Sequence, residues 1–238
     1  MATILAPAVA HATDLRVLTT GAYKAVLVAA AAQVERDTGH RLLIQNDTAG
    51  VVTQRIRAGE VFELVVLPPG NAASLGPLLG PVTPLARVGI GIAIKEGAPK
   101  PDISTVAAVR AAALAARAPA WIDPAAGGSS GIYMAKLFES WGIAAQLAPK
   151  AVLVQGGLVT DKIVDGQADL AFQQLSELTH APGVVVVGPL PPQIQNYTIY
   201  AGAVPASSTA KQAAAVVLAW LAGPKAEPVL QDKGMEKP

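Results

Sequence analysis

The chain contains no cysteine among its 238 residues. This absence excludes disulfide bonds, thiolate metal ligands and a cysteine nucleophile. It fits an oxidising compartment, although many cytosolic proteins also lack cysteine. The 3 histidines are dispersed along the chain, and no two of them stand at the spacing of metal ligands. We therefore expect neither a metal site nor a cofactor.

Aromatic and charged residues are also scarce, at 4% and 15% of the chain. The 18 basic and 17 acidic residues nearly cancel and are mixed along the sequence, so no basic stripe for nucleic acid and no polybasic membrane patch is expected. No apolar run reaches the roughly 18 residues that cross a bilayer, so we expect the chain not to be embedded in a membrane. The 52% of hydrophobic residues is ample for the core of one large domain or two lobes.

The first 12 residues, MATILAPAVAHA, are small and apolar and end in an A-x-A pattern. This resembles the end of a secretory signal whose basic first part is absent or short. A flexible alanine-rich leader is the alternative. We expect residues 1–12 to be a signal remnant or leader, and the protein to be periplasmic or secreted.

Apolar strand-like runs alternate with helix-like runs after this leader. Residues 15–18, 41–45 and 62–67 are typical of strands, and residues 23–38 and 51–58 are typical of helices. This order predicts a parallel sheet with helices on its faces.

The middle of the chain predicts a second lobe of the same kind. Residues 77–84 are rich in proline and glycine and predict a loop. Residues 86–94 predict one strand that crosses to the second lobe, and residues 189–193 a stiff return crossing. We expect an α/β fold in two lobes with a ligand cleft between them: lobe 1 at residues 13–85 plus 195–238, and lobe 2 at residues 86–194.

Four short segments place glycine, serine or threonine where a strand-like run gives way to a helix-like run. The start of a helix leaves N–H groups without partners and carries a partial positive charge, so small and hydroxyl residues there allow an anion to approach. Ordinary helix capping is the alternative, because it favours the same residues. Four such segments together favour one cleft for a small anion. The candidate ligand-binding residues in them are Thr19, Thr20, Gly21, Thr48, Ala49, Gly128, Ser129, Ser130, Gly156 and Gly157.

Two cations are further candidates for contact with an anion: Lys24, one turn into the first helix, and Arg87, at the start of the crossing strand. A plain surface role is the alternative for both. The glycine-rich stretch at residues 127–131 is not a phosphate-binding P-loop, because no Lys-Ser or Lys-Thr pair follows it. The G-x-S-x-G signature of α/β-hydrolases is absent as well.

Several of these segments together resemble the type II periplasmic solute-binding proteins, in particular their molybdate-binding branch. The segments are residues 15–21, 48–50, 123–133 and 166–170. The resemblance implies two α/β lobes with mostly parallel sheets flanked by helices, two crossings, and an anion in the cleft. It implies contacts to the anion from Thr20, Thr48, Ser129 or Ser130, and from the amides near Gly156 and Gly157. It also implies a monomer that delivers its ligand to the permease of an ABC transporter.

One departure from that branch bears on the ligand. In the molybdate binders the strand after the motif at residues 166–170 delivers a tyrosine, whereas here Gln174 stands at about that place. An amide both donates and accepts hydrogen bonds, and this favours an organic anion.

A closer resemblance is to a subgroup that includes aconitate isomerase, carried by residues 47–50, 87–91, 123–131 and 191–198. Two functions follow: an exported protein that captures a small carboxylate or oxyanion for ABC-type uptake, which we favour, or an isomerase that shifts an allylic proton in a small polycarboxylate. The isomerase needs a base, for which Lys24, Tyr133 and Tyr197 are candidates; Tyr197 is also a candidate ligand contact. A domain with unremarkable turns and no ligand is a third alternative.

Overall fold

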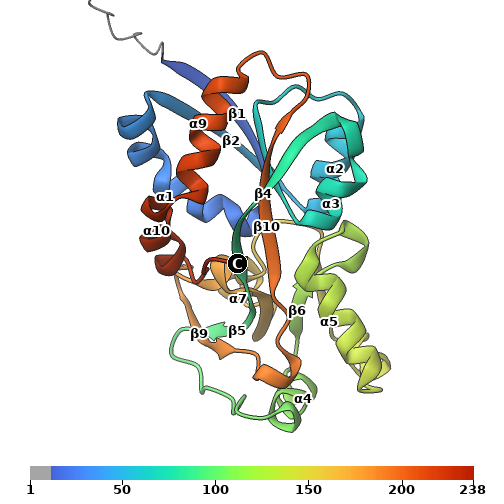
Figure 1. Ribbon diagram of the computed structural model, residues 1–238. Coiled ribbons are helices and arrows are strands. Elements are labelled where there is room, and N and C mark those ends of the chain that lie inside the picture. Colours follow the sequence, from blue (N-terminus) through green and yellow to red (C-terminus); the bar gives the residue numbers. More distant parts are fainter. Residues whose placement is uncertain (1–11) are drawn as a thin grey trace, which may run out of the picture.

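The computed structural model describes residues 12–238, so residues 1–11 of the expected leader lie outside it. Two five-stranded sheets with helices on their faces make up the described chain (Figure 1). The first sheet has the strand order β2-β1-β3-β10-β4. Its elements are β1 (Thr13–Thr20), α1 (Gly21–Thr38), β2 (His40–Asp47), α2 (Ala49–Arg57), β3 (Leu64–Leu67), α3 (Pro69–Ser74), β4 (Leu79–Val88), β10 (Thr198–Pro205), α9 (Lys211–Ala222) and α10 (Glu227–Asp232).

The second sheet has the strand order β7-β6-β8-β5-β9. Short 3₁₀ turns at Gly76–Leu78, Pro124–Ala126, Pro192–Ile194 and Pro224–Ala226 complete the described chain. The elements of the second sheet are β5 (Ile90–Lys95), α4 (Val106–Ala115), β6 (Pro119–Ile122), α5 (Ser129–Ser140), α6 (Ala144–Leu147), β7 (Val152–Val154), α7 (Thr160–Val164), β8 (Leu170–Gln174), α8 (Leu175–Leu178) and β9 (Val184–Pro189).

Both sheets follow one plan. In the first, β1 pairs in parallel with β2 and β3, and β10 runs antiparallel to β3 and β4. In the second, β6 pairs in parallel with β7 and β8, and β5 runs antiparallel to β8 and β9. The reversed strand is in each case the one that the chain enters after crossing from the other sheet. The predicted two-lobed α/β fold with mostly parallel strands is confirmed; the lobe boundaries remain a prediction.

The prediction of a loop at residues 77–84 is wrong, because β4 runs through them. This strand lies at the edge of its sheet and pairs with β10, where a proline without an N–H is tolerated. The single crossing strand expected at residues 86–94 is also wrong. The chain breaks at Gly89, so that β4 belongs to the first sheet and β5 to the second.

Helix α1 shows how an alanine-rich sequence builds the core. Its buried residues recur every three or four positions, so one face of the helix packs on the first sheet. The helix ends at Gly39, whose φ of 74° is readily adopted by glycine. The buried residues of α1 are Ala22, Tyr23, Val26, Leu27, Ala30 and Val34.

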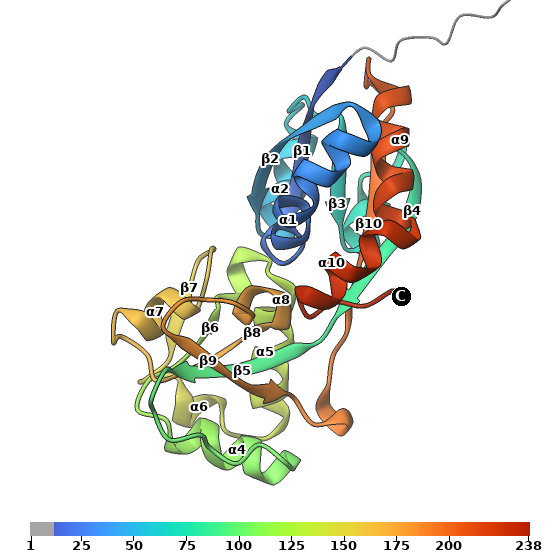
Figure 2. The same cartoon turned by 90° about the vertical axis from the view of Figure 1, so that its left-hand side faces the viewer.

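The two crossings lie side by side at one end of the gap between the sheets (Figure 2). One side chain, Gln195 of the return crossing, braces them. Its Oε1 accepts from the Ile90 N–H at 2.8 Å and its Nε2 donates to the Ile90 carbonyl at 3.0 Å. A Cβ on Gly89 would lie 2.9 Å from the Gln195 amide, so glycine is needed beside the brace.

Within residues 12–238, no single helix has the length and apolar character to cross a membrane; only the bent pair of α9 and the segment Pro224–Asp232 does so by length and composition.

Candidate functional site

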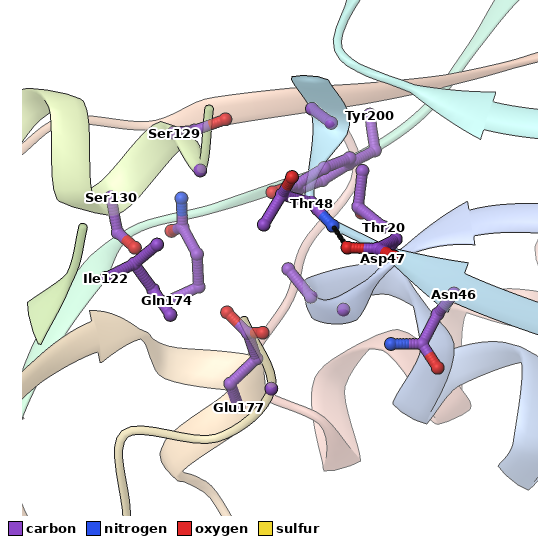
Figure 3. A pocket seen from close by; sticks show the side chains of 15 residues that line it. Thr20, Asn46, Asp47, Thr48, Ile122, Ser129, Ser130, Gln174, Glu177 and Tyr200 are labelled. Atoms are coloured by element: carbon purple, nitrogen blue, oxygen red, sulfur yellow. Dashed lines mark hydrogen bonds between the residues drawn. The ribbon is translucent and has the colours of Figure 1, made fainter. Parts of the chain in front are cut away.

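A cavity of about 40 Å³, called here the inner cavity, lies where elements of the two sheets meet. Side chains from both sheets converge on it (Figure 3). A cavity that holds a benzene-sized molecule is on the order of 150 Å³, so this one suits a single carboxylate or a small oxyanion. Its lining residues are Thr20, Gly21, Ala22, Asn46, Asp47, Thr48, Ala49, Ile122, Gly128, Ser129, Ser130, Gly157, Gln174, Glu177 and Tyr200.

Three helices begin at the inner cavity. α1 follows β1, α2 follows β2, and α5 follows β6 after a short turn, so each helix starts at the carboxyl end of a strand. The residues before α1 and α5, Thr20 and Gly128, make no side-chain cap. Their first N–H groups are therefore open to a ligand, and the positive ends of the helix dipoles favour an anion.

Two buried polar atoms in the lining lack hydrogen-bond partners within the described chain: Thr20 Oγ1 and Gln174 Oε1. These residues are only 4% and 2% exposed. The nitrogen of the same Gln174 amide does have a partner, because Nε2 donates a hydrogen bond to Thr198 Oγ1 at 2.8 Å. An unsatisfied buried polar group costs about 1–3 kcal/mol, so this pair indicates a missing hydrogen-bonding partner in the cavity.

The two halves touch at the rim of the inner cavity. The Gly50 N–H donates to the Gly127 carbonyl at 3.4 Å, and the Thr48 hydroxyl donates to the Ala126 carbonyl. A Cβ on Gly127 would lie 2.9 Å from the Gly50 Cα, and a Cβ on Gly50 would lie 3.2 Å from the Gly127 Cα. We call this contact the glycine clamp; a side chain at either position would separate the halves.

Glu177 was not anticipated from the sequence, yet it presents the only carboxyl with a raised pKa in the described chain. Its Oε1 lies 2.5 Å from where a Cβ on Gly21 would stand, so the carboxyl rests against the start of α1. Burial raises the Glu177 pKa to about 8, while the Gln173 side chain opposes part of the rise. The group is thus mostly protonated at neutral pH and can donate a hydrogen bond.

The charge of the inner cavity is unusual for an anion site. Asp47 lines it and accepts from the Thr48 N–H at 2.8 Å. Among residues 12–238, no lysine or arginine contributes to the lining. An anion here is held by N–H and O–H donors, and a second negative charge on it would be repelled by Asp47.

Tyr200 was also missed. It reaches the inner cavity from β10, whereas the resemblance to the molybdate binders implies a tyrosine at the end of β8, where Gln174 stands. Burial first, and then the charge of Glu177, raise the pKa of Tyr200. The hydroxyls of Thr20 and Ser129 lie near the phenol and oppose part of the rise, but Thr20 Oγ1 does not reach hydrogen-bond geometry with it. The phenol therefore stays a neutral donor.

The structure brings most of the predicted ligand-binding residues together and leaves others outside. Thr19 is buried, but it alternates with Thr20 along β1 and does not line the cavity. Gly156 lies beside Asp47 and Thr48 without lining the cavity. The predicted residues that do line it are Thr20, Gly21, Thr48, Ala49, Gly128, Ser129, Ser130, Gly157 and Gln174.

The cationic candidate Arg87 and two candidate bases are engaged elsewhere. The Arg87 guanidinium lies 4.9 Å from the ring centre of Tyr197 and is paired with Glu236 at 2.8 Å, near the crossings. The Tyr133 hydroxyl donates to the Ile194 carbonyl at 2.8 Å. The third candidate base, Lys24, lines a second, larger cavity next to the inner one.

No group of three or more histidine or acidic residues in the described part of the chain is placed to hold a metal ion.

Comparison with known proteins identifies the family and the fold. Residues 15–236 match the family described as bacterial extracellular solute-binding protein. An aconitate isomerase from a Pseudomonas species is 33% identical over 235 residues, which cover 94% of this chain and 88% of that protein.

Solved structures show the same fold at lower identity. The periplasmic molybdate-binding protein of Azotobacter vinelandii has a TM-score of 0.79 at 20% identity, covering 94% of this chain and 99% of that one. The sulfate-binding protein SubI of Mycobacterium tuberculosis has a TM-score of 0.72 at 14% identity, covering 94% and 87%. The chain therefore belongs to the bacterial extracellular solute-binding protein family, with the type II fold of the molybdate-binding branch, in the subgroup that includes aconitate isomerase.

Proposed function

We propose that the inner cavity binds one carboxylate or oxyanion group of a small solute, and that the protein captures this solute outside the cytoplasm for uptake through an ABC transporter. The unpartnered Thr20 and Gln174 oxygens beside three helix starts carry the proposal. Their burial is costly without a ligand. We further propose that the protein acts as a monomer and that residues 1–12 direct its export.

The test compares two isosteric variants. Thr20→Val removes an unpartnered hydroxyl from the inner cavity, and Thr19→Val removes one that is equally unpartnered but lies outside it. Calorimetric titration with sulfate, malonate and tricarballylate identifies an anion that binds the wild type. A hydrogen bond to a charged group contributes about 1.5–3 kcal/mol, so we expect Thr20→Val to weaken that binding about tenfold or more.

Thr19→Val serves as the control and should bind as the wild type does. Equal affinities in the wild type and Thr20→Val, or no binding of any anion, would remove the inner cavity as the site.

An isomerase is the second candidate function, favoured by Glu177 and by the aconitate isomerase relative. Proton abstraction next to a carboxylate needs a base whose pKa lies near the working pH. Ionised Glu177 would take a proton from the methylene carbon of cis-aconitate and return it to the far carbon of the allylic system. One proton leaves and one enters, the double bond moves, and no electrons are exchanged.

Negative charge builds up on the substrate carboxylate during proton abstraction, and hydrogen-bond donors must stabilise it. The N–H groups at the start of α1 and the hydroxyls of Thr20 and Tyr200 line the same cavity as Glu177. Donors fixed in advance stabilise such a charge without reorganisation.

Proton NMR of cis-aconitate in deuterated water tests the isomerase. An isomerase forms trans-aconitate and incorporates deuterium, and Glu177→Gln slows this about 100-fold or more. If the protein binds cis-aconitate with no new isomer and no exchange, the isomerase is excluded and solute capture remains.

A further inference from the structure

A second cavity adjoins the inner one. This outer cavity has a volume of about 520 Å³, far larger than the 40 Å³ of the inner cavity. Four residues line both cavities, so the two spaces share a wall there. The shared residues are Gly21, Asn46, Gly157 and Glu177.

The two cavities carry opposite charges. Asp47 lines the inner cavity, whereas Lys24 and Lys233 line the outer one. Lys233 is paired with Asp232 at 2.8 Å. Within residues 12–238 Lys24 has neither an ion pair nor a hydrogen bond, so its ammonium is the open positive charge of the outer cavity.

Apolar side chains also line the outer cavity, beside polar ones such as Ser176, Thr179 and His180. Val28 and Leu158 line it and are 56% and 40% exposed. Exposed apolar side chains beside an open ammonium suit a carbon chain that ends in an anionic group. An inorganic oxyanion such as sulfate has no carbon chain to contact these apolar side chains.

We propose that the ligand is a polycarboxylate that spans both cavities, with one carboxylate in the inner cavity, a second beside Lys24 in the outer cavity, and its carbon chain passing Glu177. The proposal rests on the proposed function, because the inner cavity must take the first carboxylate. It assigns a binding residue, Lys24, outside the inner cavity.

The small size of the inner cavity supports placing one carboxylate there and the others in the outer cavity. A space of about 40 Å³ is much smaller than the roughly 150 Å³ that hold a benzene-sized molecule, so one carboxylate fits it better than a whole tricarboxylate. Asp47 also disfavours a second negative charge there. The carboxylates beyond the first are therefore directed past Glu177 to the outer cavity.

Three probes that carry three, two and one carboxylates on the same carbon chain test the proposal: tricarballylate, glutarate and butyrate. Calorimetry at low salt measures their dissociation constants with the wild type, Lys24→Met and Lys136→Met. Lys136 is an exposed lysine of α5 that lines neither cavity, so its variant is matched in charge. We expect Lys24→Met to weaken tricarballylate and glutarate about tenfold and butyrate less than twofold, with Lys136→Met unchanged.

The outcomes separate this proposal from the one on which it rests. If Lys24→Met weakens all three probes equally, or none of them, the outer subsite is wrong even though the inner cavity binds. If Thr20→Val leaves the affinity of every probe unchanged, the inner cavity itself is not the site and both proposals fail.

Discussion

Glu177 makes the charge of the inner cavity depend on pH, because burial raises its pKa to about 8. Below that pH the carboxyl is neutral and can donate a hydrogen bond; above it the carboxylate adds a negative charge to that of Asp47. The other titratable groups that line the two cavities around it are Lys24 from α1, Asp47 from β2, Tyr200 from β10, and His180 and Lys233 in the outer cavity.

Replacing Glu177 with Gln isolates its share of this pH dependence. We expect the affinity of the wild type for glutarate to fall as the pH rises from 7 to 9, and the affinity of Glu177→Gln to change much less, because the amide stays neutral. Calorimetric titration of both proteins with glutarate, at several pH values in one buffer series, checks this. Parallel pH profiles of the two proteins would show that Glu177 does not control binding.

The same shift affects stability. A carboxyl whose pKa is raised by folding contributes stability below its unfolded pKa and loses it as the pH rises through the folded value. The wild type should therefore become less stable than Glu177→Gln between about pH 5 and pH 9. Thermal unfolding across this range checks the sign; a difference in Tm that stays constant with pH would contradict it.

Sequence reasoning reached some residues of the site and missed others for a physical reason. Thr20 and Ser129 stand at strand-to-helix turns, where local chemistry alone indicates a helix start. Glu177 lies in a four-residue helix and Tyr200 within a strand, and neither carries a local signal. Their places in the cleft come from packing between segments far apart in the chain.

At the scale of elements, the order of strands and helices was predictable because glycine, proline and apolar periodicity are local signals. The loop predicted at residues 77–84, where β4 runs, is wrong because the position of a strand in its sheet is not a local signal. Pro81 and Pro84 suggest a loop unless the strand is known to lie at a sheet edge, which only the sheet order reveals.

Gly131 lies where α5 packs closely on β6, so a substitution there tests how close that packing must be. A Cβ there would lie 2.0 Å from the Ile122 carbonyl oxygen, so Gly131→Ala forces the helix away from the strand. We expect a loss of about 1–3 kcal/mol in the free energy of unfolding, measured by urea denaturation.

Gly70→Ala is the control for that substitution. Nothing lies within 4 Å of a Cβ at Gly70, which is also in a helix. We expect this variant to be as stable as the wild type or slightly more stable. Equal stability of Gly131→Ala and the wild type would mean that α5 adjusts without strain.

At the scale of the whole molecule, the glycine clamp makes the contact between the two halves sensitive to one side chain. Gly50→Leu places atoms where Gly127 now sits, since even a Cβ would lie 3.2 Å from the Gly127 Cα. We expect ligand affinity to fall about tenfold or more while the unliganded variant keeps its fold.

Small-angle scattering with saturating ligand checks whether the two halves come together. The wild type should become more compact than Gly50→Leu, and Gly70→Leu, on an open surface, should behave as the wild type does. The same compaction in all three proteins would show that the clamp does not limit closure. No sequence signal pairs Gly50 with Gly127, because only the meeting of the two halves brings them together.

The Gln195 brace limits how the two halves can move relative to each other. Because one amide holds both backbone groups of Ile90, the crossings cannot slide past each other without breaking two hydrogen bonds. An opening motion that keeps both bonds is a swing about an axis near that joint, with displacement that grows with distance from it. Fluorescent labels at the outer ends of α2 and α7 would report large changes, whereas labels flanking the joint would stay silent.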